Sequence, residues 1–195
     1  GLVTSKESAM RFIKEQLTRN IFYTDAALVS LAYAAAEDNC MNEILELDML
    51  CTAVKLPGES RNASNKIGLR LLKIFRQVEN CCFSNQYYNE ILSGKALGHY
   101  CIAFGILAQS LHAGKHESVA GFYYNAASAF VINAVKLVPL GQQDGQEMLL
   151  ALFPLIDKLA GQSMDPNKKM IGYCCAGFDI RCMQHEKLYS RLYMS

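Results

Sequence analysis

The most regular feature of this sequence is the spacing of its apolar residues, which recur every three or four positions along almost the whole chain. That spacing matches the 3.6-residue period of an α-helix with one face turned inward. The sequence has no run that alternates with period two between turn dipeptides, as a half-buried strand would. The pattern predicts helices over residues 4–17, 21–38, 43–54, 60–78, 85–92, 98–112, 117–138, 141–159 and 178–186.

Two of these segments carry further expectations. Thr4 and Glu7 have the spacing of a capping box, which would start the first helix. Residues 117–138 are apolar on nearly all sides, and Phe122, Phe130 and Val131 point in different directions around the helix. A helix without a polar face is typically surrounded by others, so this segment is predicted to be the central, most buried helix.

The segment 60–78 separates its apolar residues from its charges. Its apolar stripe follows helical spacing and consists of Ile67, Leu71, Ile74 and Val78. The basic residues lie opposite that stripe and are Arg61, Lys66, Arg70, Lys73 and Arg76. A basic run of this kind is most often a solvated helix face, which leaves the apolar stripe to pack inward.

These elements predict an all-α fold: a single-domain helical bundle of about eight to ten helices spanning residues 1–195. With 51% hydrophobic residues in 195 positions, the chain can form one sizeable core. No apolar stretch is long enough to span a membrane, and the first residues do not resemble a signal peptide. We therefore expect a cytoplasmic protein whose eight cysteines are reduced. A net charge of +1 gives no reason to expect a nucleic-acid partner.

The search for catalytic motifs finds little. The chain lacks a P-loop, a Gly-x-Ser-x-Gly elbow and a His-Glu-x-x-His motif. It also lacks the Glu-x-x-His pairs of di-iron bundles. We expect no enzymatic activity and no cofactor. His99, at the start of an apolar helix, is more typical of a cap or of a hydrogen-bonded, partly buried histidine than of a metal ligand.

Possible metal ligands gather near the C-terminus, where Cys174, Cys175, Cys182 and His185 fall within twelve positions. Cys182 and His185 are three residues apart and would share one helix face. Thiolate and imidazole suit zinc, nickel or copper. The spacing lacks the Cys-x-x-Cys knuckle of structural zinc sites, so incidental thiols are the favoured interpretation and no metal site is expected.

The last residues, 187–195, have the composition of an interaction segment. They contain two tyrosines, two leucines, an arginine and a methionine, whereas chain ends are usually polar and frayed. Tyrosine and arginine dominate the energetics of many protein interfaces. Docking of this segment on its own domain is equally compatible with that composition.

Several motifs, in this order, resemble those of the urease accessory protein UreF family. They are Gly98-His99-Tyr100 with Phe104-Gly105, the run from Val135 to Gln146, Met183-Gln184-His185-Glu186, and Tyr189-Ser190-Arg191-Leu192. Arg61, Ser64 and Gly68 resemble a motif of the family's first half. The resemblance covers essentially the whole chain. The family's Pro/Gly-rich opening segment is missing here, and the chain ends in Tyr193-Met194-Ser195 where Phe-Arg-Ser is commoner.

The resemblance implies a cytosolic, all-α homodimer without chemistry of its own. UreF proteins bind the accessory protein UreD (UreH in some systems) and the GTPase UreG. Together these act on apo-urease and insert nickel in a GTP-dependent way. By this resemblance the partner-binding residues are Tyr189, Ser190, Arg191, Leu192, Lys136, Gln142, Asp144, Gln146, His185 and Glu186.

Within that set, residues 189–192 would organise the dimer and dock a partner, and Lys136 would belong to the GTPase or fidelity surface. Asp144, near a helix start, has capping as its ordinary role. His185 and Glu186 would hold the tail. Two alternatives stay open: a metallochaperone that itself binds nickel through Cys182 and His185, and an all-α enzyme or ligand-binding bundle unrelated to urease.

Overall fold

The computed structural model describes residues 3–79, 81–173 and 176–189, and within them the chain is helical with no strand. The predicted all-α class is therefore confirmed. Nine α-helices are described: α1 Lys6–Glu15, α2 Asp25–Glu37, α3 Met41–Val54, α4 Gly58–Val78, α5 Cys82–Leu92, α6 Tyr100–Ser110, α7 Lys115–Leu137, α8 Gln142–Gln162 and α9 Ala176–His185. Among these residues no helix is both long and apolar enough to cross a bilayer.

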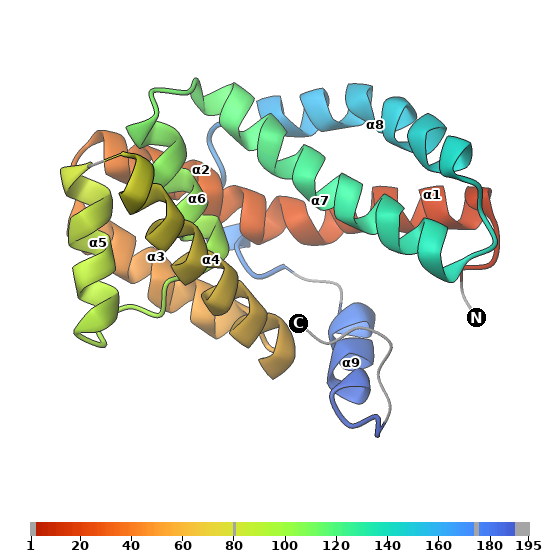
Figure 1. The fold of residues 1–195 in the computed structure, drawn as a ribbon, viewed down its shortest axis with the longest axis horizontal. Helices are drawn as coiled ribbons and strands as arrows, with labels where there is room; N and C mark the ends of the chain where they lie inside the picture. Colours follow the sequence, from red (N-terminus) through yellow and green to blue (C-terminus); the bar gives the residue numbers. More distant parts are fainter. Residues whose placement is uncertain (1–2, 80, 174–175, 190–195) are drawn as a thin grey trace.

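The first two α-helices are joined by helical backbone rather than by a loop. A π-helical turn, Gln16–Asn20, and a 3₁₀ turn, Ile21–Tyr23, connect α1 to α2, and the four segments cross the molecule in one line (Figure 1). The cap of α1 differs from the prediction. Ser5, not Thr4, is the N-cap, and the Ser5 amide donates to Ser8 Oγ over 2.9 Å.

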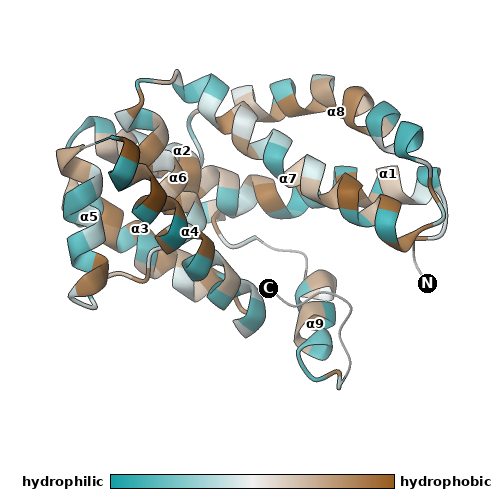
Figure 2. Cartoon of the chain, viewed as in Figure 1, coloured by the Kyte–Doolittle hydropathy of each residue, from teal (hydrophilic) through white to brown (hydrophobic). Residues whose placement is uncertain are grey.

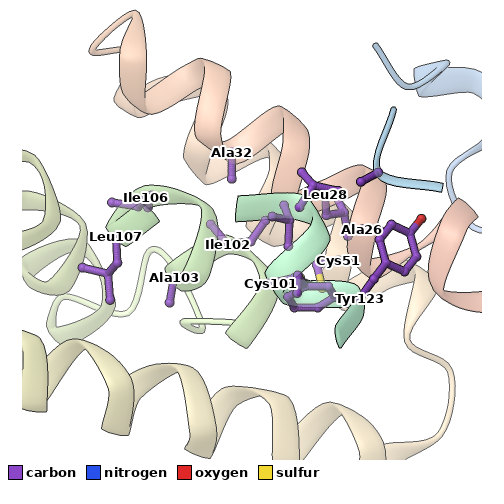
Figure 3. Packing of buried hydrophobic residues seen from close by; sticks show 14 of the residues in the cluster. Ala26, Leu28, Ala32, Cys51, Cys101, Ile102, Ala103, Ile106, Leu107 and Tyr123 are labelled. Atoms are coloured by element: carbon purple, nitrogen blue, oxygen red, sulfur yellow. Dashed lines mark hydrogen bonds between the residues drawn. The ribbon is translucent and has the colours of Figure 1, made fainter. Parts of the chain in front are cut away.

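The core is centred on α2 and α6, which pack along each other and are flanked by α3, α4 and α7. Figure 3 shows buried residues of both helices, among them Ala32 of α2 and Ile102 of α6. The closest approach is at Gly105 of α6, where a Cβ would lie 2.6 Å from the Val29 carbonyl oxygen and 2.9 Å from Ala32 Cβ. Small residues let the two helix axes approach closely, which explains why this pair rather than α7 forms the centre.

The prediction that residues 117–138 form the most buried helix is wrong. One face of α7 packs inward through Phe122, Tyr123 and Val131, but Tyr124 and Ile132 on its outer side are 41% and 53% exposed. The periodicity of an apolar surface is the same whether a core or another protein covers it. The sequence therefore could not separate the two cases.

α7 and α8 form an antiparallel pair, with α1 lying beside both. The N-terminus of α1 is tied to the start of α8, because Lys6 Nζ is bonded to Asp144 Oδ1 over 3.0 Å and also pairs with Glu147. This layer lies to one side of the α2–α6 core, and α9 is set below it (Figure 1).

The outer surface of α4 also departs from the prediction. Its buried residues are Ser64, Gly68 and Leu72, whereas Ile67 and Ile74 of the expected inward stripe are about half exposed. Gly68 explains why this side of α4 faces inward. A Cβ at Gly68 would lie 2.1 Å from the carbonyl oxygen of Gly98, so only this side of α4 can approach α6 so closely.

Candidate partner-binding surfaces

A groove between the end of α7 and the start of α8 contains three of the residues predicted to bind partners. Its volume is about 260 Å³, and it is lined by Tyr124, Ser128, Val131, Ile132, Val135, Lys136, Gln142, Gly145, Gln146 and Leu149. Lys136, Gln142 and Gln146 lie at the surface, and the three polar groups are brought together by the short connection after α7. We call this surface the α7/α8 groove.

Two sequence features shape the groove. Pro139 follows α7, which ends at Leu137, because proline disfavours helical backbone in the residue before it. Gly145 lets the two helices approach, since a Cβ there would lie 2.9 Å from Val135 Cγ2. A larger residue at position 145 would push the helices apart and change the spacing of Lys136 and Gln146.

Asp144 faces away from the groove and has a structural role. Its Oδ2 accepts the Gly141 amide over 3.0 Å, capping α8, and its Oδ1 accepts Lys6 Nζ. The hydrogen bond from Lys6, followed by that from the Gly141 amide, lowers the pKa of Asp144 below its ordinary value. The capping role expected for Asp144 is thus confirmed. A direct role in partner binding stays a prediction.

Exposed apolar side chains extend the groove along the outer side of the α7/α8 pair. The rings of Tyr124 and Phe153 lie 5.9 Å apart, and Phe153 is 45% exposed. Ile132 and Leu150 are more than half exposed nearby on the same two helices. An apolar surface of this kind, with polar groups at one end, is typical of a protein interface.

A second set of motif residues, which includes Gly98 and His99, proves to be internal. The Asp48 carboxylate, 1% exposed, accepts the Tyr87 hydroxyl over 2.6 Å and the backbone amides of Leu97, Gly98 and His99 over 2.7, 3.1 and 3.2 Å. Gly98 has a φ of +79°, which a glycine adopts without strain. Burial and the neighbouring Asp48 raise the pKa of Tyr87 well above its ordinary value.

His99 continues this internal network. It is fully buried, and its Nδ1 lies 3.2 Å from Ser64 Oγ and its Nε2 2.9 Å from Thr52 Oγ1. The expectation of a hydrogen-bonded histidine is confirmed. The motif residues Ser64, Gly68 and His99 therefore hold α4 against the start of α6. Asp48 was missed, although an aspartate among the apolar residues of 44–51 is a signal for a buried carboxylate.

A partly exposed ion pair and two buried thiols lie near this network. Lys55 Nζ is 2.7 Å from Asp25 Oδ1, and Cys51 Sγ is 3.5 Å from Cys101 Sγ. Burial alone would raise the pKa of Asp25, but the Lys55 ammonium outweighs it and lowers that pKa. The hydrogen bond from Cys101 lowers the pKa of Cys51 to about 7. The two thiols belong to the core, whereas Asp25 and Lys55 keep some exposure and line a small pocket at the surface.

α9 is fastened to the first turn of α4 by the two residues expected to hold the tail. The Glu186 carboxylate accepts the Glu59 amide over 2.7 Å, which satisfies a free donor at a helix N-terminus. His185 Nδ1 lies 3.2 Å from Glu59 Oε2. Phe178, on the same helix, packs near Phe12 of α1 with ring centroids 6.3 Å apart.

The arrangement near Cys182 does not assemble a metal site from described residues. In residues 3–79, 81–173 and 176–189 no three histidine, cysteine or acidic side chains are grouped so that they could hold a metal ion. Burial raises the pKa of the Cys182 thiol, which disfavours the thiolate that metals require. Cys174 and Cys175 lie outside the described residues.

The predicted tail residues are described only up to Tyr189. That tyrosine is fully exposed, and Leu188 before it is 53% exposed. Ser190, Arg191 and Leu192 lie outside the described residues. Their part in dimer and partner contacts stays a prediction.

Comparison with known proteins agrees with the motifs. The family model described as UreF matches residues 3–153. A urease accessory protein UreF of Actinobacillus pleuropneumoniae serotype 5b is 40% identical over 195 residues, covering all of this chain and 86% of the relative. Proteins of the same name from Haemophilus influenzae PittEE and Bacillus sp. TB-90 are 39% and 32% identical, with all of this chain and 83% and 86% of the relatives covered. The chain is therefore a member of the UreF family of urease accessory proteins.

Proposed function

We propose that this protein is a non-catalytic scaffold for urease maturation in the cytoplasm. It would join UreD (UreH) and the GTPase UreG in a complex that inserts nickel into apo-urease in a GTP-dependent way. Membership of the UreF family supports this role. The observation that carries it at the level of residues is the α7/α8 groove, where the predicted Lys136, Gln142 and Gln146 adjoin an exposed apolar surface.

The apolar part of that surface is the best candidate for a homodimer interface. Tyr124, Ile132, Leu150 and Phe153 expose large apolar area on two rigid helices, and permanent dimer interfaces are more apolar than transient ones. A second copy would cover these side chains by two-fold symmetry, with the same residues contributed from each side.

The polar end of the groove is assigned to the GTPase. Lys136 and the amides of Gln142 and Gln146 offer charge and directional hydrogen bonds, which fix orientation and specificity better than apolar contacts do. α9 and the tail that follows it are assigned to UreD, because His185 and Glu186 place the start of this tail beside α4. Such a scaffold would hold nickel donor and acceptor close together, so that the ion is not released into water.

Two variants separate these roles. Phe153→Lys should convert the dimer to a monomer in sedimentation experiments, whereas Lys136→Glu should leave the dimer intact and weaken co-purification of UreG by about tenfold or more. Lys158→Glu is the matched control for charge. Position 158 is nine residues after Leu149, half a turn away around α8.

Urease activation in cells that express the whole maturation system completes the test. Both Phe153→Lys and Lys136→Glu should lower it, and Lys158→Glu should not. Normal activation with Phe153→Lys and Lys136→Glu combined would refute the assignment of this surface. UreG recovery that is equal for Lys136→Glu and Lys158→Glu would refute the division of roles.

The tail is tested separately. Arg191→Ala should leave the thermal midpoint nearly unchanged and weaken dimer or UreD binding by about tenfold or more, since arginine is a frequent hot-spot residue. Calorimetry and pull-down on the same preparation measure both quantities. A collapsed midpoint with normal binding by the folded fraction would make the tail a structural strut.

A further inference from the structure

A third surface, on the outer side of α4, is not used by the groove or by the contact with α9. It comprises Lys66, Ile67, Arg70, Lys73, Ile74 and Val78, and we call it the α4 outer face. Ile67, Ile74 and Val78 are 51%, 53% and 80% exposed. Figure 2 shows α4 at the front of the molecule with both hydrophobic and hydrophilic positions along it. Twelve residues separate its ends, which corresponds to a length of about 18 Å.

The α4 outer face is strongly basic for a nearly neutral protein. α4 has five basic residues and one acidic residue, although the formal net charge of the whole chain is +1. Arg61 and Arg76 have partners inside the molecule, the Lys55 carbonyl and the Tyr88 ring. Lys66, Arg70 and Lys73 form no salt bridge with any residue that the structure describes.

The apolar and basic residues of this face form two adjacent rows. At 100° per residue, Ile67, Ile74 and Val78 fall within a narrow sector. Arg70, Lys66 and Lys73 fall in the sector beside it, which corrects the expectation that the basic residues lie opposite the apolar stripe. One row therefore offers apolar contact over about three turns, and the other offers cations along its edge. The matching partner surface is an apolar stripe bordered by carboxylates.

We propose that the α4 outer face binds an acidic amphipathic helix of another protein. Burying the Ile67–Ile74–Val78 row supplies affinity, while carboxylates of the partner pair with Lys66, Arg70 and Lys73 and set the orientation. The proposal adds a contact to the scaffold role and does not depend on which partner occupies the α7/α8 groove.

Charge complementarity favours this occupant over the other candidates. In a symmetric pair of α4 helices, the arginines and lysines of the two copies would meet near the two-fold axis, which is unfavourable. A nucleic acid would use the cations but would leave the exposed isoleucines and valine without a role, because phosphate binding is electrostatic. An acidic amphipathic helix satisfies both rows.

The test uses the full chain and three synthetic helical peptides measured by fluorescence anisotropy. The first peptide has leucines at i, i+4 and i+7 with glutamates beside them, the second has lysines in place of the glutamates, and the third has serines in place of the leucines. The first should bind and the other two should bind at least about tenfold more weakly. Raising the salt from about 0.05 M to about 0.5 M should also weaken the first, since the charges are exposed.

Two double variants test the two rows separately. Ile67→Ser with Ile74→Ser, and Lys66→Glu with Lys73→Glu, should each weaken the first peptide by about tenfold or more. Leu92→Ser with Lys14→Glu is the control, because Leu92 is 67% exposed on α5 and Lys14 lies on α1. Circular dichroism verifies that every variant is folded.

Three results would overturn the proposal. The first is that the wild-type chain binds the peptide with leucines and glutamates no more tightly than it binds the other two peptides. The second is a wild-type dimer, seen in sedimentation, that the two isoleucine substitutions dissociate, because a second copy would then occupy the face. The third is binding of a duplex oligonucleotide that depends on Lys66 and Lys73 but not on the isoleucines.

Discussion

Asp48→Asn tests the idea that one buried carboxylate joins α3, α5 and α6. The wild-type side chain accepts four hydrogen bonds, three at Oδ2 from Tyr87, Gly98 and His99 and one at Oδ1 from Leu97. In the variant, the amide oxygen can replace Oδ2, but the amide nitrogen then faces the Leu97 amide, and two donors cannot pair.

The expected loss of stability follows from the number of hydrogen bonds that the substitution breaks or weakens. One buried donor left unpaired costs about 1–3 kcal/mol, and the three remaining bonds weaken because a neutral acceptor replaces a charged one. Part of this loss is offset because no charge has to be buried. We expect Asp48→Asn to lower the free energy of unfolding by about 2–4 kcal/mol. Asp48→Ala would leave all four donors unpaired and would approach the whole stability of a typical domain.

Urea unfolding followed by circular dichroism measures the effect. Asp157→Asn is the matched control, because Asp157 is 79% exposed on α8 and should change stability by less than about 0.5 kcal/mol. A double-mutant cycle that combines Asp48→Asn with Tyr87→Phe should show a coupling free energy of about 1 kcal/mol or more between the two side chains. A loss below about 0.5 kcal/mol for Asp48→Asn would mean that the carboxylate does not hold the 97–99 segment.

Three further predictions follow from packing and charge. Gly68→Ala should destabilise the chain by about 3 kcal/mol or more in urea unfolding, because the new Cβ would overlap the Gly98 carbonyl; an unchanged midpoint would contradict the register of α4. Pairing with Lys55 lowers the pKa of Asp25 below its ordinary value of 3.8. The pair should therefore stabilise the fold above pH 3.8, and this stabilisation should be lost as the pH falls below 3.8 and the carboxylate becomes protonated. Lys55→Met should reduce that acid sensitivity. Phe130→Ala should cost about 1–3 kcal/mol, less than a fully buried phenylalanine, since Phe130 is only half-buried.

Helix positions were predictable from the sequence, because the apolar periodicity of a helix and the residues that end it are local features. Pro139 and the Pro57-Gly58 pair mark helix ends in the sequence and in the structure alike. The first cap was misplaced by one residue, since Thr4, Ser5 and Ser8 are all able to accept or donate the capping bond. The sequence therefore predicts the right kind of cap, a capping box, but places it one residue too early.

Burial was less predictable, because an apolar row looks the same under a core or under a partner. Ile67 and Ile74 were expected inside, and Ile132 was expected in the central helix, yet all three are exposed. In α4 the deciding residue is Gly68, whose missing side chain matters only once α6 is known to lie against it. That information is tertiary and is not carried by the spacing of α4 itself.

The sequence predicts individual residues of the candidate site, but it does not predict that they lie together. The resemblance singled out Lys136, Gln142 and Gln146, and the α7–α8 turn brings them to one groove. It also singled out Asp144, which turned out to cap α8 and hold Lys6. Asp48 was not singled out, because its partners, the Tyr87 hydroxyl and three backbone amides, lie 39 to 51 residues away.

The tie between Lys6 and the start of α8 has a consequence for synthesis of the chain. The two bonded residues, Lys6 and Asp144, are 138 positions apart, so α1 leaves the ribosome long before its partner exists. At ordinary translation rates of about 5–20 residues per second, that interval is about 7–28 s. During it, the apolar face of α1 that includes Ile13 has no α8 to cover it. The N-terminal helix is therefore an early element of the chain but a late element of the fold.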